Sequence, residues 1–208
     1  MQNYQVTISG LTAILMHNGR TANPMDSFVR AMKATTSKRG KTEDDFEALA
    51  KFEFYAGLYT TPSIECDKES GEIVVPKVAK LCALAHVLDS NIRKGAQRHK
   101  EGKIAAAGCL VEGDGQFFYN GNKTTVPDDW ESFAHVCAVK VGQARVMRCR
   151  PRFENWSIKF SVCVDESICD KSHLARWMDS AGKLVGIGDW RPEKGGSFGR
   201  YTSDVKAG

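Results

Sequence analysis

The sequence predicts an α+β protein whose strands and helices follow one another in the order βαββαβ. Residues 4–9 and 155–164 alternate between apolar and polar side chains, which is typical of half-buried strands. A helix is expected from about Asp170, because apolar side chains then recur at helical spacing. A glycine-rich loop over 186–199 and a short strand over 200–205 follow it. Together with the first strand and the helices after it, this succession predicts the fold class.

The composition indicates a folded protein rather than a fibrous or disordered chain. Of its 208 residues, 42% are apolar and 26% are charged, and the net charge is +4. No apolar run approaches the roughly 20 residues that span a bilayer. The first ten residues lack the pattern of a secretory signal, so we expect a cytoplasmic location and no membrane partner. The seven cysteines include no C-x-x-C motif, and we expect reduced thiols, no metal and no cofactor.

Local signals also predict elements between the two ends of the chain. Asp26 is expected to cap a helix reaching about Thr35, and Thr42 to open a second helix with acidic residues in its first turn. Pro76 suits the first position of a third helix. The apolar stripe of that third helix would be Val78, Leu81, Ala85, Leu88 and Ile92.

The region after this helix predicts short strands. Residues 105–111 and 116–120 are expected to be strands on either side of a Gly-Asp-Gly turn at 113–115. Residues 136–141 and 144–149 are expected to pair as a hairpin around a tight two-residue connection.

The basic residues are unevenly distributed along the chain. Residues 30–41, 91–103 and 140–152 each hold five lysines or arginines, which is fifteen of the 29 in the sequence. Such segregation of charge indicates a surface for an anionic partner. Three separate solvated faces are the alternative interpretation.

The sharpest basic pattern is an arginine row in the last of these stretches. Arg148, Arg150 and Arg152 are two residues apart and would project from one face of an extended segment, with Arg145 preceding them. Guanidinium groups make charge-assisted contacts with phosphates, so the row favours a polyphosphate backbone. The alternative is an edge strand kept charged against aggregation.

The glycine-rich loop combines features that suit a nucleic-acid backbone. Five glycines within 186–199 allow positive φ angles and close backbone approach. The loop also carries Trp190, Arg191, Lys194 and Phe198, so amides, cations and aromatic rings occur together. It matches neither a Walker A loop nor a dinucleotide fingerprint. An ordinary flexible loop is the alternative.

The histidines show no metal-ligand spacing. His17 follows the first apolar segment in a His-Asn-Gly turn. A lone histidine could act as a general acid or base. A structural role in the turn is the alternative.

The two ends of the sequence resemble the RAMP superfamily of CRISPR proteins, particularly its Cas7-like backbone subunits. The segment from Tyr4 through His17 to Gly19 is similar to their first strand and following turn. Residues 186–199 are similar to their C-terminal glycine-rich loop, and the Gly-Asp-Trp-Arg-Pro run within it is also of a kind found in phage and prophage proteins. The resemblance covers about a quarter of the chain.

This resemblance implies a modified ferredoxin-like (RRM/RAMP-type) antiparallel sheet with helices on one face. It implies one domain over 1–208 with an inserted region at about 60–135, and non-catalytic binding of single-stranded DNA or RNA. Self-association, head to tail, or a nucleoprotein complex is also implied. If the protein is phage-encoded, its location would be the bacterial host cell.

We therefore expect a basic groove formed jointly by the arginine row and the glycine-rich loop. The predicted nucleic-acid contacts are Lys38, Arg39, Arg93, Arg98, Arg145, Arg148, Arg150, Arg152, Trp190, Arg191, Lys194, Gly195, Gly196, Phe198 and Arg200. One alternative is a metal-independent RNA endonuclease of the Cas6-like type that uses His17. Another is a phage-encoded inhibitor or interaction protein that mimics a CRISPR subunit.

Overall fold

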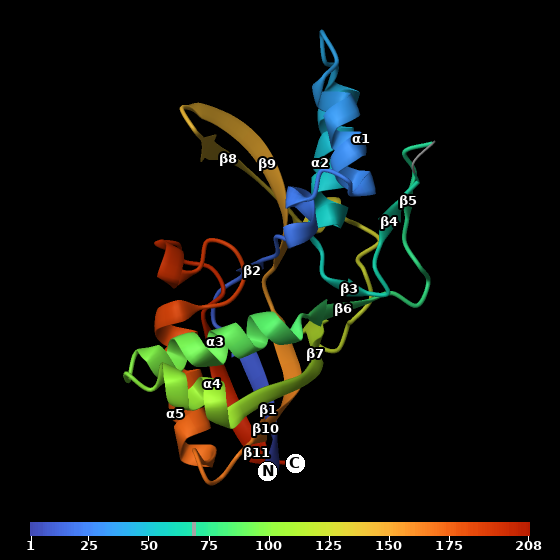
Figure 1. The fold of residues 1–208 in the computed structure, drawn as a ribbon. Helices are drawn as coiled ribbons and strands as arrows, with labels where there is room; N and C mark the ends of the chain where they lie inside the picture. Colours follow the sequence, from blue (N-terminus) through green and yellow to red (C-terminus); the bar gives the residue numbers. More distant parts are fainter. Residues whose placement is uncertain (68–69) are drawn as a thin grey trace. The chain divides into compact units, whose positions relative to one another are not determined.

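A computed structural model describes residues 1–67 and 70–208, which divide into two compact units (Figure 1). Unit 1 comprises residues 1–14, 81–124 and 153–208, and unit 2 comprises 15–80 and 125–152. In sequence, unit 2 is thus two insertions into unit 1. The inserted region expected at about 60–135 contributes to both units, and its residues 68 and 69 lie outside the described part of the chain.

Unit 1 is built on an antiparallel sheet. Its strands, in the order β11-β1-β10-β7-β6, are Tyr201–Ala207, Gln2–Gly10, Trp156–Val164, Cys109–Tyr119 and Lys80–Ala83. Two helices connect β6 to β7, namely α3 (Ala85–Gln97) and α4 (Gly102–Gly108). Helix α5 (Lys171–Ser180) and a π-helical turn at Ala181–Val185 connect β10 to β11.

This arrangement confirms the predicted α+β class and its βαββαβ order. Counting β1, β7, β10 and β11 as the four strands, their order across the sheet is fourth, first, third, second, which is the ferredoxin-like arrangement. Helices α3, α4 and α5 cover one face of this sheet (Figure 1). The alternation predicted for 4–9 and 155–164 is observed, because the apolar side chains of β1 and β10 are buried toward the helices.

The predicted start of the third helix, at Pro76, is wrong. Helix α3 begins only at Ala85, residues 80–83 form strand β6, and Val78 is 71% exposed. The start of α3 is fixed from a distance, because the Asp114 carboxylate accepts the Ala85 N–H at 2.8 Å. The cap residue Leu84 provides no side-chain hydrogen bond of its own.

The Gly-Asp-Gly sequence is also not a turn between two strands. Strand β7 runs through it, and the pairing with β10 shifts register between Lys159 and Ser161, as at a β-bulge. Gly113 has φ +72°, and a Cβ on Gly115 would lie only 2.9 Å from a methyl group of Leu88 in α3. The glycines therefore serve the bulge and the close approach of α3 to the sheet. Of the strand expected over 105–111, residues 105–108 belong instead to helix α4, and residues 109–111 are the start of β7.

Helix α3 is anchored in the core by a buried polar contact. Asn91 donates to the Gly186 carbonyl at 2.8 Å and accepts from the Tyr201 hydroxyl at 2.5 Å. Burial raises the pKa of the Tyr201 hydroxyl well above its usual value, so it remains a donor. Gly95, one turn further along α3, lies so close to the Trp177 carbonyl of α5 that a Cβ would approach its oxygen to 2.1 Å.

Unit 2 contains two helices and several short strands. Helices α1 (Ser27–Thr36) and α2 (Glu43–Gly57) begin where predicted, capped by Asp26 and by Thr42, which forms a capping box with Asp45. The predicted hairpin is β8 (Ala134–Val141) and β9 (Ala144–Phe153), a long curved ribbon in Figure 1. The remaining elements are β2 (Ile14–Leu15), β3 (Thr60–Thr61), β4 (Glu65–Cys66), β5 (Ile73–Val74) and 3₁₀ turns at Gly19–Ala22 and Glu131–Phe133.

The cysteines are all free thiols, six of them buried and Cys137 half-buried. The Sγ atoms of Cys109 and Cys169 lie 3.7 Å apart in unit 1, and burial raises the pKa of both thiols. Burial also raises the pKa of Cys149 to about 12. Among the described residues, no helix is long and apolar enough to cross a bilayer.

Because Gly95 packs directly against Trp177, adding a single methyl group at position 95 is predicted to lower the stability of the protein. Gly95→Ala is expected to lower the free energy of unfolding by about 2 kcal/mol, because α3 and α5 must separate. The same change at an exposed helical site would be stabilising by about 1 kcal/mol. Urea denaturation followed by circular dichroism measures the difference. Ser90→Ala, on the exposed side of α3, is the control and should not destabilise the protein. Equal stability of Gly95→Ala and the wild type would contradict this packing.

Candidate nucleic-acid interface

The β8–β9 hairpin presents the arginine row on one face. The register pairs Arg150 with His135 and Arg148 with Cys137, so Arg148, Arg150 and Arg152 share a face with these two β8 residues. The two strands pair without interruption up to Val141 and Ala144, and Gly142 in the turn has φ +61°. The three arginines therefore lie on one face of the hairpin, as their two-residue spacing predicts.

Arg145 belongs to the opposite face of the same hairpin. It lies directly across from Lys140, and both side chains are exposed. Like charges placed directly opposite each other destabilise a strand pair. Within residues 1–67 and 70–208, neither side chain has an ion-pair partner that would offset this repulsion.

Arg148 is partly neutralised by a carboxylate on helix α2. Its Nη1 donates to Glu53 Oε1 at 2.7 Å, and Glu53 Oε2 accepts the backbone N–H of Cys149 at 2.6 Å. The Arg148 side chain remains 39% exposed, whereas that of Glu53 is only 10% exposed. Arg148 therefore fixes the hairpin on α2 and keeps part of its guanidinium accessible.

Arg150 and Arg152 are half-buried, and they influence the neighbouring imidazole. Arg150 Nη1 donates to Cys137 Sγ at 3.9 Å. Burial lowers the pKa of His135 below its usual 6.5, and the charges of Arg152 and Arg150 lower it further. His135 is therefore neutral at pH 7 and adds no charge to this face.

The glycine-rich loop, in unit 1, is closed by its own hydrogen bonds. The N–H of Ile187 donates to Gly199 at 2.9 Å, and that of Phe198 donates to Trp190 at 3.2 Å. A Cβ on Gly196 would lie 1.8 Å from the Trp190 carbonyl oxygen. These glycines are thus required for the folding of the loop, and several of its amides are directed inward.

Arg191 of the loop and Arg200 after it contact neighbouring groups of unit 1. Arg191 donates to Glu193 at 2.8 Å and to the Gly188 carbonyl at 3.0 Å, and Lys94 from α3 contacts the same carboxylate at 2.8 Å. Burial would raise the pKa of Glu193, but the hydrogen bonds from Lys94 and Arg191 hold it below its usual value. Arg200 donates to the Lys183 carbonyl. Lys194 is exposed at the end of a 3₁₀ turn, Pro192–Lys194.

The aromatic side chains of the loop lie together. The ring centroids of Trp190 and Phe198 are 6.5 Å apart and the planes are inclined by 39°. Trp190 is 38% exposed and adopts φ +48°, a left-handed conformation that is uncommon for residues other than glycine. Part of the indole is thus held at the surface by the fold of the loop.

The other predicted contacts are surface cations: Lys38 and Arg39 lie in the loop between α1 and α2, Arg93 lies on α3, and Arg98 follows its last residue. Lys38 pairs with Asp45 at 2.6 Å, and Arg39 beside it is exposed. Arg93 pairs with Asp89 at 2.5 Å, and Arg98 is exposed after the end of α3. The predicted residues thus fall into two sets: unit 2 holds Arg145 and the arginine row together with Lys38 and Arg39, and unit 1 holds the remainder.

His17, the predicted alternative catalytic residue, is exposed in unit 2. Its backbone carbonyl accepts the Tyr59 hydroxyl at 2.8 Å, so the turn is held through the main chain. Among the described residues, no group of three or more His, Cys, Asp or Glu side chains is placed to hold a metal ion.

Lys140 and Glu53 belong to the candidate site but are not among the residues predicted from the sequence. For Lys140 a signal exists, because a two-residue hairpin loop implies that it pairs with Arg145. Glu53 lies 95 residues before Arg148, and nothing local in the sequence indicates their contact.

No protein-family model matches the chain, and no curated protein matches it. Among solved structures, one similar chain belongs to a "Type IV-B CRISPR Complex". The TM-score is 0.45 at 9% sequence identity, and the match covers 99% of this chain and 90% of that chain. This is a distant likeness, from which nothing follows about what the present chain binds.

The Glu53–Arg148 contact predicts a modest loss of stability on neutralising the carboxylate. Glu53→Gln is expected to lower the free energy of unfolding by about 1 kcal/mol, because Arg148 loses a charged partner that is only partly solvated. Chemical denaturation measures the change. Glu47→Gln on the exposed side of α2 is the control. Equal effects of the two substitutions would show that Glu53 acts only through net charge.

Proposed function

We propose that this protein binds single-stranded nucleic acid without cleaving it, and that the β8–β9 hairpin supplies the main contact. The observation that carries the proposal is the pair Lys140–Arg145, two exposed cations directly opposite each other. This arrangement is unfavourable for the hairpin alone. Closely spaced phosphates remove the repulsion on binding, so the pair favours a polyanionic backbone.

A single strand is favoured over a duplex because the chain also carries an exposed aromatic surface. Trp190 and Phe198 offer ring faces on which unpaired bases can stack. Bases within a duplex are already stacked and paired. Phosphate and ring-face contacts carry little sequence information, so we expect weak sequence preference.

The proposed contacts divide into direct contacts and positioning residues. Lys140, Arg145 and Lys194 contact phosphates directly, whereas Arg148 and Arg191 mainly orient the surfaces that carry them. Self-association or a nucleoprotein complex remains part of the proposal. The further proposed contacts are Lys38, Arg39, Arg93, Arg98, Arg150, Arg152, Trp190, Gly195, Gly196, Phe198 and Arg200.

Removing the opposed pair tests the proposal directly. Lys140→Gln/Arg145→Gln is expected to weaken binding to labelled single-stranded RNA and DNA. The slope of log affinity against log salt should become shallower by about 1.4, because two phosphate contacts are lost. Fluorescence anisotropy over a salt series measures both quantities.

The matched control is Lys51→Gln/Lys77→Gln, which removes the same charge from exposed sites of unit 2 outside the hairpin. Its salt slope should remain close to that of the wild type. If both double variants lose affinity equally, net charge rather than the hairpin governs binding. Affinity of the wild type that does not fall with salt would exclude a phosphate-based contact altogether.

The same RNA, incubated with the protein in EDTA, separates this proposal from the alternatives. Cleavage that disappears in His17→Ala would replace the binding function with that of a metal-independent endonuclease. A protein partner captured from nuclease-treated host lysate, without affinity for nucleic acid, would instead favour an inhibitor.

A further inference from the structure

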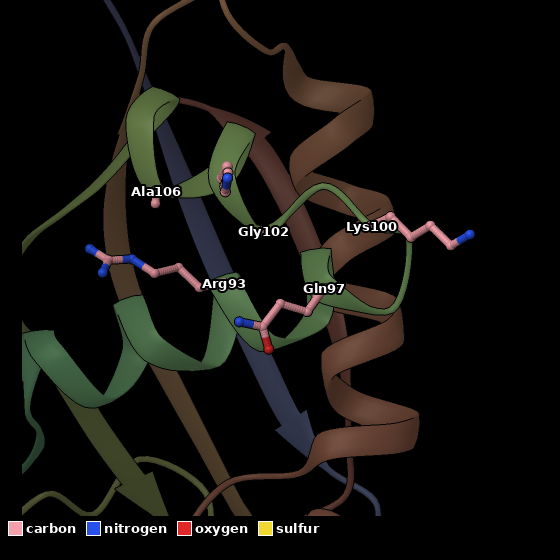
Figure 2. A pocket seen from close by; sticks show the side chains of 6 residues that line it. Arg93, Gln97, Lys100, Gly102 and Ala106 are labelled. Atoms are coloured by element: carbon pink, nitrogen blue, oxygen red, sulfur yellow. The ribbon is translucent and has the colours of Figure 1, made fainter.

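A basic hollow lies between helices α3 and α4 of unit 1 (Figure 2). Its volume is about 430 Å³, and no carboxylate occurs among its described lining residues. The α3 residues in its wall are one turn apart and so lie on the same side of the helix. The lining residues are Arg93, Gln97, Lys100, Gly102, Lys103 and Ala106.

The donors of the hollow come from two different helices. Arg93 and Gln97 extend from α3 on the side that faces α4 (Figure 2), and Lys103 belongs to α4. Lys100 extends from the intervening turn away from Arg93 (Figure 2), so it adds positive charge at the rim rather than a direct contact. A guanidinium, an amide and an ammonium around one space suit an oxyanion with several acceptor atoms.

The neighbouring carboxylates leave much of this charge uncompensated. Glu101 is directed to α5, where it accepts from Arg176 and from the Trp177 indole, each at 2.6 Å. Asp89 contacts one nitrogen of Arg93 at 2.5 Å, and the guanidinium has further N–H groups. A bound anion would therefore share Arg93 with Asp89.

The turn that joins the two helices carries a lysine where glycine is conformationally favoured. Lys100 has φ +62°, and the Glu101 N–H donates to Ala96 at 3.0 Å, which closes the end of α3 in the manner of a Schellman motif. Glycine adopts this left-handed position without the steric cost that a lysine has there. The Lys100 side chain is exposed, so it contributes little to packing, and its charge adds to the positive field at the rim of the hollow.

We infer that the hollow between α3 and α4 binds a phosphate group, held by the Arg93 guanidinium, the Gln97 amide and the Lys103 ammonium. The site lies wholly within unit 1 and is independent of the β8–β9 hairpin of unit 2. Its volume exceeds that of one phosphate, so it also accommodates a short polyphosphate. The phosphate could belong to a polynucleotide backbone or to a free nucleotide.

Isothermal titration of the full chain with tripolyphosphate at low ionic strength tests this site. Ala106→Glu places a carboxylate in the wall and should abolish binding, whereas Ala106→Gln, of equal size and uncharged, should stay within about twofold of the wild type. Ala106 is exposed on α4 and both replacements are good helix formers, so both variants should fold.

Variants of the donors locate the binding further. Arg93→Gln and Lys103→Gln should each weaken binding roughly tenfold, because each loses a charge-assisted contact. Lys171→Gln removes the same charge from an exposed site of unit 1 outside the hollow and should change affinity by less than about twofold. Asp89→Asn should strengthen binding, since Arg93 is then no longer shared.

The outcomes distinguish the site from general attraction and from the hairpin. No binding by the wild type, equal binding by the two Ala106 variants, or an effect of Lys171→Gln as large as that of Arg93→Gln would overturn the inference. In the Lys140→Gln/Arg145→Gln background, where affinity for RNA is reduced, the difference in tripolyphosphate affinity between Ala106→Glu and Ala106→Gln should persist. Displacement of tripolyphosphate by a thymidine oligonucleotide identifies a backbone phosphate, and tighter binding of ATP without such displacement identifies a free nucleotide.

Discussion

The placement of α3 depends on its close approach to both the sheet and α5. Gly115 admits Leu88 against β7, and Gly95 admits the Trp177 carbonyl, so two missing side chains bring three elements together. The buried Asn91 side chain, on the same helix, forms hydrogen bonds with Gly186 and Tyr201. The packing of α3 therefore fixes the position of Gly186, where the glycine-rich loop begins, and of the turn between α3 and α4. Close packing of this kind tolerates little change in volume, because neither the carbonyl of α5 nor the backbone of β7 can move aside.

The basic residues of the chain divide according to what surrounds them. Arg191, Lys94 and Arg148 are held by carboxylates and contribute to the fold. Lys140 and Arg145 oppose each other with no compensating carboxylate among residues 1–67 and 70–208, and the hollow between α3 and α4 likewise has no acidic residue in its described lining. Some basic residues therefore stabilise the fold, whereas others repel each other and destabilise it. The net charge of +4 combines both kinds, so it says little about where an anion binds.

Local sequence signals predicted the elements whose determinants are local. The helix starts predicted at Asp26 and Thr42 and near Asp170 are observed, because each of these residues caps its helix through groups within three residues. The start of α3 could not be predicted, since its cap comes from Asp114, 29 residues away. The Gly-Asp-Gly sequence was predicted as a turn because its actual role depends on distant residues. Its glycines accommodate a bulge against β10 and the approach of Leu88 from α3. In the candidate site, spacing predicted the face shared by Arg148, Arg150 and Arg152. The contact with Glu53 and the closure of the glycine-rich loop depend on residues that only the fold brings together.

The half-buried state of Cys137 has a practical consequence for labelling. The other six thiols are buried, and burial raises the pKa of Cys66, Cys109, Cys149 and Cys169, which suppresses the reactive thiolate. A maleimide fluorophore should therefore attach mainly to β8 in the unmodified chain. The dye would then sit on the strand paired with the arginine row and report ligand arrival without any cysteine being replaced.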